Sequence, residues 1–600
     1  MSDTSRVSDA APKPDRAADP VLLAIVQKQL DHITRQMGAV MTRTARSPIF
    51  SESHDFSCFL GTADGTVVAQ ADGLPIHSGG GGFALRAVLD KQAGEMEEGD
   101  VFLLSDPYVA GGNHLPDWTM IRPVFVSGTL CGFAANRAHQ SDIGGGAAGT
   151  YNPEATEIFH EGIRLPVLRL VEKGRIRKDL WELLLLNTRY PELMDGDLQA
   201  MLGSLRIGAA RMTALLSELG VEDSAVYLEG VLGHGERMLR AEIAALKDGV
   251  TYGEDGSDTD CFQAVDVPVK VRLTVDGDTM TFDFTGSAPQ VRGFKNSSLA
   301  NTHSAVYLAL ATFFEHSIPR NGGTYRAVTI VAPRGSVVNA LPPAPMTMNT
   351  VFPAMDIVNA CWKALAQVDP GRALSGWGKS VNGISSGRTP AGDPFVMYHW
   401  HSSPGGGAMA GRDGYPVTGP LPTLGGLVMP NVETYERVYP CRIHLQEFRC
   451  DSAGAGRYRG GPSVAYEAEI LVPSQHAMRN EGLRRPSGFG TGGGHYGAQG
   501  MMEVSIEGEP RRPAPQYAVE RGGPMRIWTH GCAGGGWGDP LERDPESVAR
   551  DVLDGIVSVE QASAVYGVVI TGDGLDRNGT AQRRADRRAA GNGKAGGQGI

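Results

Sequence analysis

Glycine is the residue that most constrains how this chain can fold, because it makes up 80 of the 600 residues. That is about twice the usual share of roughly 7% in globular proteins. Because glycine has no Cβ atom, the surplus predicts many tight turns and many places where the backbone closely approaches another backbone or a ligand. Glycine and proline are dense among short apolar runs in 385–540, so we expect a β-rich unit with long loops there.

The remaining composition excludes several classes of protein. Hydrophobic residues make up 41% and charged residues 20%, which is ordinary for a globular chain. The net charge is −12 and the only basic cluster is at 583–588, so no nucleic acid partner is expected. Seven scattered cysteines without a CxxC pair argue against a disulfide framework or a cysteine zinc site. There is neither a secretory signal nor an apolar run of about 20 residues, so we expect a cytoplasmic protein without a membrane partner.

The beginning of the folded chain combines a long helix with a hairpin. Asp19-Pro20 provides a helix cap followed by proline at the first helical position, and apolar residues continue at helical spacing to about Arg46. Between 56 and 69, apolar residues alternate on both sides of the turn sequence Asp64-Gly65. This alternation predicts a β-hairpin.

Further along the chain, strand-like and helical patterns alternate. Short apolar runs in 76–170 are typical of buried strands that end in loops, whereas 178–249 is apolar at helical spacing. A second alternating pattern covers 267–284 and predicts another hairpin. Helices are expected at 298–315 and 354–368.

Two short helices near the C-terminus are marked by their caps. Asp544-Pro545 starts the first. Ser558 and Gln561 form a capping box for the second, which ends before Gly567. Beyond these helices few residues are apolar, and we expect a disordered tail.

These patterns predict the α+β fold class, with mixed multi-layer sheets, a helical central segment and a β-rich, glycine-rich C-terminal half. No internal repeat of solenoid or propeller period is present. The predicted units are a disordered arm at 1–18, a metal-site domain with the helical segment at 19–255, an α+β domain at 256–384, a β-rich domain at 385–540, C-terminal helices at 541–570 and a disordered tail at 571–600.

The densest group of potential metal ligands lies between residues 114 and 139. His114 and Asp117 are separated by Leu115 and Pro116, and His139 follows at the end of an apolar run. The proline argues against a continuous helix, so a bent loop would have to aim both side chains at one point. Two imidazoles and a carboxylate can hold Zn²⁺, Mn²⁺ or Fe²⁺ and leave positions open for water or substrate. The alternative is that these are loop residues that hydrogen-bond the backbone.

Five other polar residues lie in loop-like stretches nearby: His77, Asp106, Asp142, His160 and Glu161. Any of them can support a ligand, act as a general base or have no chemical role. Asp142 and Glu161 are the predicted catalytic residues. Each is expected either to act as the general base or to orient a histidine ligand.

Phosphate-binding and nucleophile motifs fail on inspection. The segment 376–380 (GWGKS) resembles the end of a P-loop, but that motif requires glycine at position 373, where this chain has Ala373. No GxSxG motif is present, and Cys58 and Cys131 lie in strand-like runs that favour inert, buried thiols. If ATP is used, we expect its main site on another polypeptide.

Several longer segments resemble the hydantoinase B family. This family includes the second subunits of N-methylhydantoinases and lactamases, the C-terminal half of 5-oxoprolinase, and the metal-bearing subunits of acetone-type ketone carboxylases. The resemblance runs from about residue 20 to 570. It is carried by HDFSCFLGTADGTVVAQ (54–70), GDVFLLSDPYVAGGNHLPDWTMIRPVF (99–125), FAANRAHQSDIGG (133–145), EGIRLPVLRL (161–170), FTGSAPQVRG (284–293), IPRNGGTYR (318–326), RYRGGPS (457–463) and GGGWGDPLERDPESVARDVLDGIVSVEQASAVYGVV (534–569).

The resemblance implies a metal site and its ligands. In relatives, the histidine and aspartate of the HLPD segment and the first histidine of the RAH segment bind a divalent metal. This implies one Zn²⁺ or Mn²⁺ per chain, held by His114, Asp117 and His139. The family often has a second histidine where this chain has Gln140, which cannot carry a proton, so any role of that histidine is in doubt here.

The resemblance also implies a partner. An A-type subunit of such complexes binds ATP and Mg²⁺ and phosphorylates the carbonyl oxygen of the substrate, and water activated by the metal then attacks the carbonyl carbon. The leading hypothesis is therefore the metal-bearing subunit of an ATP-dependent cyclic-amide hydrolase acting on a hydantoin, 5-oxoproline or a lactam. We expect a heterotetramer with two copies of each subunit, because closed two-fold symmetry is the commonest arrangement.

Three alternatives remain open at this stage. A ketone carboxylase subunit would require bicarbonate for activity. A mononuclear iron oxygenase also uses two histidines and one carboxylate, but the HxxD spacing is unusual for that class. A non-catalytic scaffold subunit would contain no metal, and His114→Ala would not change the activity of its complex.

Overall fold

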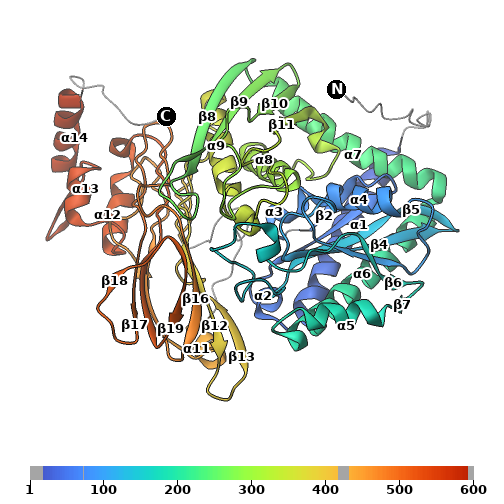
Figure 1. Cartoon of the computed structure of the whole chain (residues 1–600). Coiled ribbons are helices and arrows are strands. Elements are labelled where there is room, and N and C mark those ends of the chain that lie inside the picture. Colours follow the sequence, from blue (N-terminus) through green and yellow to red (C-terminus); the bar gives the residue numbers. More distant parts are fainter. Residues whose placement is uncertain (1–17, 72, 417–430, 592–600) are drawn as a thin grey trace.

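The computed structural model describes residues 18–71, 73–416 and 431–591 (Figure 1). The predicted disordered arm at 1–18 lies outside the described residues, except for Ala18. Figure 1 shows the chain passing from a first sheet (blue) through a middle unit (green to yellow) to a β-rich C-terminal part (orange to red). Helices and several separate sheets share one chain, which confirms the predicted α+β fold class.

The first sheet is antiparallel throughout and has seven strands in the order β2-β1-β5-β4-β3-β6-β7. Its strands are β1 (Phe56–Thr62), β2 (Val67–Gln70), β3 (Val101–Leu104), β4 (Asp117–Val126), β5 (Thr129–His139), β6 (Leu168–Glu172) and β7 (Arg175–Ile176). The hairpin predicted around Asp64-Gly65 is β1–β2. Both faces of the central strands are buried, which explains why 76–170 contains continuous apolar runs rather than alternating ones.

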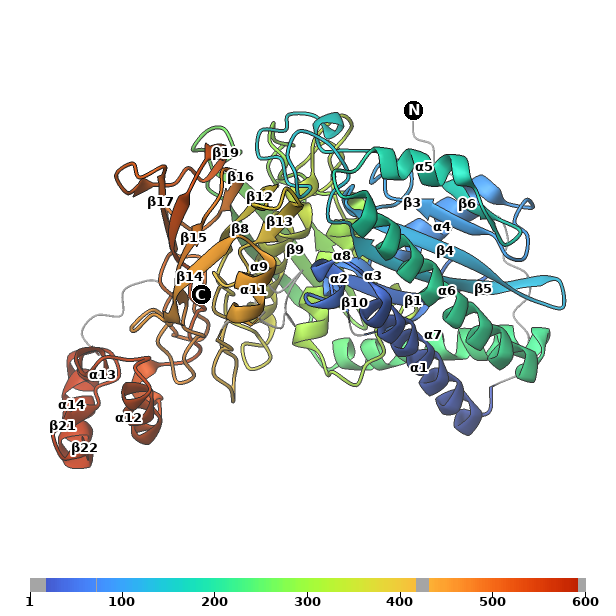
Figure 2. The ribbon, with the colours of Figure 1, turned by 90° about the horizontal axis from the view of Figure 1, so that it is seen from below.

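Helices cover both faces of this sheet. On one face lie α1 (Pro20–Thr44) and α6 (Pro191–Leu219), next to α5 (Lys178–Leu186) and α7 (Val221–Ala244) (Figure 2). The other face is covered by α4 (Gly81–Gln92), whose buried residues pack with Phe59, Ile121 and Phe133. The predicted start of α1 is confirmed, because the Asp19 carboxylate accepts a hydrogen bond from the Leu22 N–H at 2.9 Å.

The middle unit is a four-stranded sheet in the order β11-β10-β9-β8. It is mixed, since β10 and β11 are parallel and the other pairs are antiparallel. Its strands are β8 (Gly249–Ser257), β9 (Val267–Asp276), β10 (Thr279–Asp283) and β11 (Val328–Val331), and it packs against α9 (Ala354–Val368), which contacts α8 (Leu299–Phe313). The predicted hairpin at 267–284 and both predicted helices are therefore present.

The C-terminal part contains two antiparallel sheets, in the orders β13-β12-β16-β19 and β14-β15-β20-β17-β18. The helix α11 (Val432–Val438) precedes the second sheet. The strands are β12 (Val381–Arg388), β13 (Pro394–Tyr398), β14 (Cys441–Phe448), β15 (Val464–Ile470), β16 (Ser474–Asn480), β17 (Met501–Ile506), β18 (Arg512–Pro513), β19 (Tyr517–Gly522) and β20 (Met525–His530).

Glycine-rich loops beside these sheets are joined directly through their backbones. The Gly461 N–H donates to the Gly406 carbonyl at 2.8 Å, and the Gly534 N–H donates to the Gly461 carbonyl at 3.0 Å. A Cβ atom at Gly534 would lie 1.8 Å from the Gly406 oxygen, which no side chain could tolerate. The glycine surplus of the sequence is therefore used for backbone-to-backbone packing as well as for turns.

The predicted disordered tail at 571–600 is wrong where the structure describes it. After α12 (Pro545–Leu553) and α13 (Val559–Ala564), the chain forms β21 (Val569–Thr571), β22 (Gly574–Asp576) and α14 (Arg577–Gly591). Arg584 on α14 donates to the carbonyls of Tyr566 and Arg543 at 3.0 and 2.7 Å. The helix is thus attached by arginine hydrogen bonds, so its lack of apolar residues did not indicate disorder. Both predicted caps, at Asp544 and Ser558, are confirmed.

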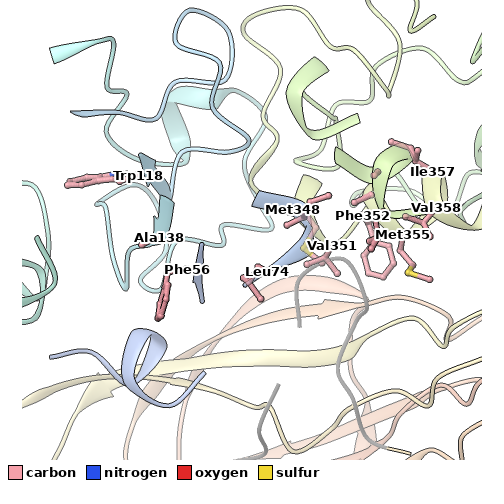
Figure 3. Packing of buried hydrophobic residues seen from close by; sticks show 14 of the residues in the cluster. Phe56, Leu74, Trp118, Ala138, Met348, Val351, Phe352, Met355, Ile357 and Val358 are labelled. Carbon is pink, nitrogen blue, oxygen red and sulfur yellow. The ribbon is translucent and has the colours of Figure 1, made fainter. Parts of the chain in front are cut away.

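The predicted boundaries at 255/256 and 384/385 fall inside the strands β8 and β12. The division into domains otherwise stays a prediction. A hydrophobic cluster extends from α1 to β20, and in Figure 3 Leu74 lies between Phe56 of the first sheet and Met348 and Val351. Among the described residues, no helix combines the length and apolar character needed to cross a membrane.

Candidate metal centre

Strand register brings an aspartate and a histidine together at one end of the first sheet. Asp117 is the first residue of β4, and it lies opposite His139, the last residue of β5. Side chains alternate between the faces of a strand, so Asp117 and His139 project to one side while the neighbouring pair, Trp118 and Ala138, packs in the core on the other (Figure 3). Asp55 precedes β1, and its carbonyl accepts the His139 N–H at 3.1 Å.

His114 reaches the same point from the bend that the sequence predicted. The Asp117 N–H donates to the His114 carbonyl at 3.2 Å, which closes a tight turn through Pro116. His114 Nε2 then lies 2.7 Å from Asp117 Oδ1, and His139 Nδ1 lies 3.1 Å from the same oxygen. One ligand atom from each residue lies within 4.8 Å of the other two, and all three side chains are buried. The structure therefore brings the three predicted ligands together.

The tautomer of His114 follows from its hydrogen bond. Its Nδ1 lies 2.5 Å from the carbonyl oxygen of Thr347, and a carbonyl only accepts, so Nδ1 carries the hydrogen. In the neutral ring, Nε2 then presents a lone pair to the Asp117 carboxylate. Two acceptors at this distance require a cation or a proton between them. His114 Nε2 and Asp55 Oδ1 are also buried without a hydrogen-bond partner, so these side chains fit a divalent cation.

The charges of the cluster support the same interpretation. Burial alone would raise the pKa of Asp117, but the neighbouring histidines hold it well below its usual value. Burial alone would lower the pKa of His114, yet Asp117 raises it above the ordinary value. Without metal, the cluster thus favours a proton on His114, at the position where a cation would stabilise the same carboxylate.

Two more side chains join the cluster. His77, on the short helix α3 (Pro75–Ser78), places Nε2 3.1 Å from Asp117 Oδ2 and 3.7 Å from Asp55 Oδ1. The sequence had marked His77 only as one of several nearby polar residues, and it had not singled out Asp55. Burial raises the pKa of Asp55, and the histidines counteract that rise. The only signal for Asp55 in the sequence was its position directly before a strand, and many aspartates occupy such positions.

Glu161 is linked to His114 through the backbone of Thr347. Its two carboxylate oxygens accept the N–H groups of Thr347 at 2.7 Å and Met346 at 3.0 Å. Thr347 is the residue whose carbonyl accepts the His114 hydrogen, so Glu161 shapes the segment that orients this imidazole. Burial raises the pKa of Glu161 to about 7. Its predicted catalytic role stays a prediction, and its contacts support an orienting role.

Asp142 contacts His139 only indirectly, through the loop that ends at Thr150. It accepts hydrogen bonds from the N–H groups of Gly144 and Gly149, at 3.1 and 3.3 Å, and from the Arg189 guanidinium at 2.9 Å. These contacts fix the loop that ends at Thr150, which has a φ of 70°, unusual for a β-branched residue. Thr150 Oγ1 lies 3.2 Å from His139 Nε2. The role of Asp142 also stays a prediction.

The other nearby candidates lie outside the cavity. Asp106 accepts the N–H groups of Tyr108 and Val109 at 2.8 and 2.9 Å, and so builds a turn. His160 is exposed. Gln140 is directed toward α6, where its Nε2 lies 3.7 Å from the Met201 sulfur, so the departure from the family pattern leaves the cluster unchanged.

Residues distant in the sequence form the far wall of a cavity of about 20 Å³ at the cluster. They are Tyr151, Met348, Thr350, Val351, Ser380, Asn382, Tyr398, Trp400 and Arg479. In Figure 2, β12 and β13 lie at the edge of the C-terminal part that faces the first sheet. The hydroxyl of Tyr398, at the end of β13, donates to the Gly149 carbonyl at 3.0 Å. No motif in the sequence marks the residues of this wall.

A buried arginine supports the cluster from the opposite side. Arg137 of β5 donates to Thr119 Oγ1 at 2.7 Å, to Asn113 Oδ1 at 2.9 Å and to the His77 carbonyl at 3.0 Å. All of these acceptors are neutral, and burial lowers the pKa of Arg137 to about 10. Arg137 therefore fixes the backbone that carries His77 and the turn before His114.

Comparison with known proteins places this chain in a family. The chain is 32% identical to the beta subunit of caprolactamase from Pseudomonas jessenii, over 94% of this chain and 99% of that protein. It is 30% identical to the B component of a proposed D-/L-hydantoinase from Pseudomonas sp. (strain NS671), over 92% and 95%. 5-Oxoprolinase 1 from Arabidopsis thaliana is 29% identical over 88% of this chain, which corresponds to 42% of that longer protein.

Solved structures agree in fold. The crystal structure of ATP-dependent caprolactamase from Pseudomonas jessenii superposes with a TM-score of 0.87 at 32% identity, covering 95% of this chain and all of that chain. Nucleotide-free acetone carboxylase superposes with a TM-score of 0.85 at 20% identity, covering 96% and 84%, which shows the shared fold alone. The sequence model of the Hydantoinase B/oxoprolinase family matches residues 19–540. The chain therefore belongs to the Hydantoinase B/oxoprolinase family.

Proposed function

We propose that this chain is the metal-bearing subunit of an ATP-dependent cyclic-amide hydrolase. The observation that carries the proposal is the buried pair of acceptors, His114 Nε2 and Asp117 Oδ1, 2.7 Å apart beside a cavity. Relatives in the family are components of an ATP-dependent caprolactamase and of a hydantoinase, so the amide class of substrate is the one that family membership favours.

His114, Asp117 and His139 would hold the metal, and Asp55 provides a further carboxylate at the cavity wall. Imidazole and carboxylate ligands suit both Zn²⁺ and Mn²⁺. Such an ion, when bound, lowers the pKa of water toward neutrality and so prepares it for attack on a carbonyl carbon. Glu161 and Asp142 keep the two histidines in place through Thr347 and Thr150.

His77 is the group of this chain placed to hold a proton near the reaction. Its Nε2 lies 3.1 Å from Asp117 Oδ2 and 3.7 Å from Asp55 Oδ1. Its Nδ1 is buried without a hydrogen-bond partner. We infer that His77 takes up the proton released from water as a general base beside these two carboxylates.

The segment that resembles a P-loop does not serve as a phosphate cradle. The N–H groups of Gly376 and Gly378 donate to the carbonyls of Phe489 and Gly405 at 2.7 and 2.9 Å. Lys379 donates its N–H to Ser487 Oγ at 3.0 Å, and its ammonium group binds Asp356 at 2.7 Å. A phosphate cradle needs these groups to be free.

The nucleotide is therefore assigned to a partner. We propose an A-type subunit that binds ATP and Mg²⁺ and phosphorylates the carbonyl oxygen, in a complex with two copies of each subunit. Two relatives are themselves named as the beta and the B components of their enzymes, which supports a partner of this kind.

The test is co-expression with the A-type partner. ATP consumption is measured with hydantoins, lactams, 5-oxoproline and ketones, with and without bicarbonate. We expect ATP-coupled opening of a cyclic amide that needs both subunits and no bicarbonate. Bicarbonate-dependent consumption of a ketone would instead identify a carboxylase. Amide opening by the isolated, metal-loaded chain without ATP would show a simple metallohydrolase.

A further inference from the structure

Arg479 is a buried cation without an acidic partner. It lies on β16, paired with Asn382 of β12 and Tyr517 of β19, and its side chain lines the cavity at the metal centre. Only 3% of the residue is exposed, and its Nε has no hydrogen-bond partner. Within the described part of the chain, no carboxylate forms an ion pair with its guanidinium group.

The other buried cations among the described residues either pair with a carboxylate or donate hydrogen bonds to neutral oxygens. Lys295 lies 2.6 Å from Glu481, and Lys379 lies 2.7 Å from Asp356. Arg543 binds Asp551 at 2.7 Å. Arg137 has no carboxylate partner, but its N–H groups donate to neutral oxygens. Because an unpaired buried charge is costly, its presence at a cavity needs a reason in function.

Aromatic rings hold this guanidinium group toward the metal centre. Its central carbon lies 4.1 Å from the Tyr151 ring centroid and 5.6 Å from that of Tyr398. The Tyr151 ring is stacked on His139, with centroids 5.8 Å apart, and the Tyr398 hydroxyl lies 3.5 Å from His139 Nε2. Both rings that contact Arg479 thus also contact a predicted metal ligand, and Arg479 Nε has no hydrogen-bond partner that would compete with an anion.

The charge of the cavity also favours an anion. The carboxylates of Asp55 and Asp117 balance a divalent cation held by the cluster, so Arg479 supplies an excess positive charge. A guanidinium group binds two oxygens of a phosphoryl group in a fork, which gives both strength and orientation. The cavity of about 20 Å³ is smaller than a phosphorylated substrate, so binding one requires its wall to open, and the unbranched side chain of Met348 is the lining group best suited to a change of rotamer.

We propose that Arg479 binds the phosphoryl group of the activated, phosphorylated carbonyl substrate and so places its carbon at the metal centre. This inference rests on the proposed function. The same guanidinium chemistry would also suit a carboxylate carried by the substrate itself, such as that of 5-oxoproline. The experiment must therefore distinguish these two sources of the anion.

The direct test is binding of inorganic phosphate to the isolated, metal-loaded full chain by calorimetry. We expect Arg479→Gln to weaken phosphate binding by at least about tenfold, the effect of losing a charge-assisted pair. Arg479→Lys, which keeps the charge, should restore part of the affinity. The control is Arg388→Gln, an exposed position on the neighbouring strand β12, which should bind like the wild type. Equal affinity in the wild type and in correctly folded Arg479→Gln would overturn the proposal.

The second test uses the complex with its ATP-binding partner. Arg479→Gln should lower amide opening by about 100-fold, typical for loss of one group that stabilises a developing anion. Metal content should remain unchanged, and ATP consumption should continue without amide opening. An equal defect with an uncharged lactam and with 5-oxoproline supports the phosphoryl assignment, whereas a defect limited to 5-oxoproline contradicts it. If the wild-type complex opens no cyclic amide, the proposed function fails, and phosphate binding by the isolated chain still decides the role of Arg479.

Discussion

Two buried polar clusters of this protein differ in how their donors and acceptors are matched. Around Lys379, charges are balanced: its ammonium group binds Asp356 at 2.7 Å and the Gly256 carbonyl at 2.7 Å. At the end of the first sheet, His114 Nε2 and Asp117 Oδ1 face each other at 2.7 Å as two acceptors. In the first arrangement a cation of the protein already faces the carboxylates, and the second needs a cation or a proton.

A shifted pKa does not separate the two clusters. Burial raises the pKa of Asp356 to about 6, although Lys379 counteracts it, and burial raises the pKa of Asp55 in the other cluster. Shifted values therefore occur at structural ion pairs as well as at candidate sites. The distinguishing feature is that two acceptors face each other at the end of the first sheet, whereas the lysine of the P-loop-like segment faces carboxylates and is therefore assigned a structural role.

The largest effect should come from removing a ligand of the unmatched cluster. His114→Ala or Asp117→Ala should lose the metal and lower amide opening by at least about 10³-fold, because a metal supplies several kcal/mol of transition-state stabilisation. Elemental analysis and turnover of the complex provide the measurement. His160→Ala, an exposed histidine nearby, is the control and should keep about one metal ion per chain. Full metal content in the Asp117 variant would refute the cluster as a metal site.

The matched cluster should respond in stability instead. Lys379→Met leaves Asp356 buried without its cation, while Asp255 keeps Lys363 at 3.4 Å, and should lower the free energy of unfolding by about 3–5 kcal/mol. Urea unfolding measures this loss, and the variant that remains folded should keep its metal. An unchanged stability combined with loss of ATP-dependent activity would mean that Lys379 does bind phosphate.

An intermediate effect is expected behind the metal ligands. Glu161→Gln places an amide NH₂ against one of the two backbone N–H groups that the carboxylate now accepts. Misorientation of Thr347, and through it His114, should weaken metal affinity by about 10- to 100-fold. Competition with a chelator measures the affinity, and the exposed Glu157→Gln is the matched control. A large loss of turnover with unchanged metal affinity would instead make Glu161 a general base.

The smallest effect is a difference in the pH dependence of stability. Without metal, burial acts to lower the pKa of His114 but Asp117 raises it above the ordinary value, so protonation stabilises the fold. That contribution is complete below about pH 6.5 and is lost as pH rises through the raised pKa. Metal binds only the deprotonated ring, so the stability of the loaded protein should rise with pH over the same range. Urea midpoints with and without chelator should therefore have opposite slopes, and parallel slopes would contradict this assignment.

Local patterns in the sequence predicted local structure well. The alternation at 267–284 gave β9 and β10, and the caps Asp19, Asp544 and Ser558 gave correct helix starts. Each of these signals depends only on residues within a few positions of one another. The tail was misjudged because α14 is attached through arginine hydrogen bonds to carbonyls, which hydrophobic patterns do not report.

The candidate site was predicted only in part, because it depends on long-range pairing. Residue type and family resemblance identified His114, Asp117 and His139, but the register that places Asp117 opposite His139 cannot be read from composition. Asp55 joins through the pairing of β1 with β5. Arg479 reaches the cavity from more than three hundred residues along the chain, and nothing near it in the sequence distinguishes it from other arginines.

The interlocked glycine loops restrict how the cavity can diversify. Gly406, Gly461 and Gly534 join segments from across the C-terminal part, and a methyl group at Gly534 would collide with backbone rather than with a movable side chain. A single substitution at one of these glycines would therefore displace backbone beside the sheets that carry Arg479 and Tyr398. We therefore expect relatives with other substrates to differ in side chains that face the cavity, such as Met348 and Val351, and to keep the glycines that join these loops.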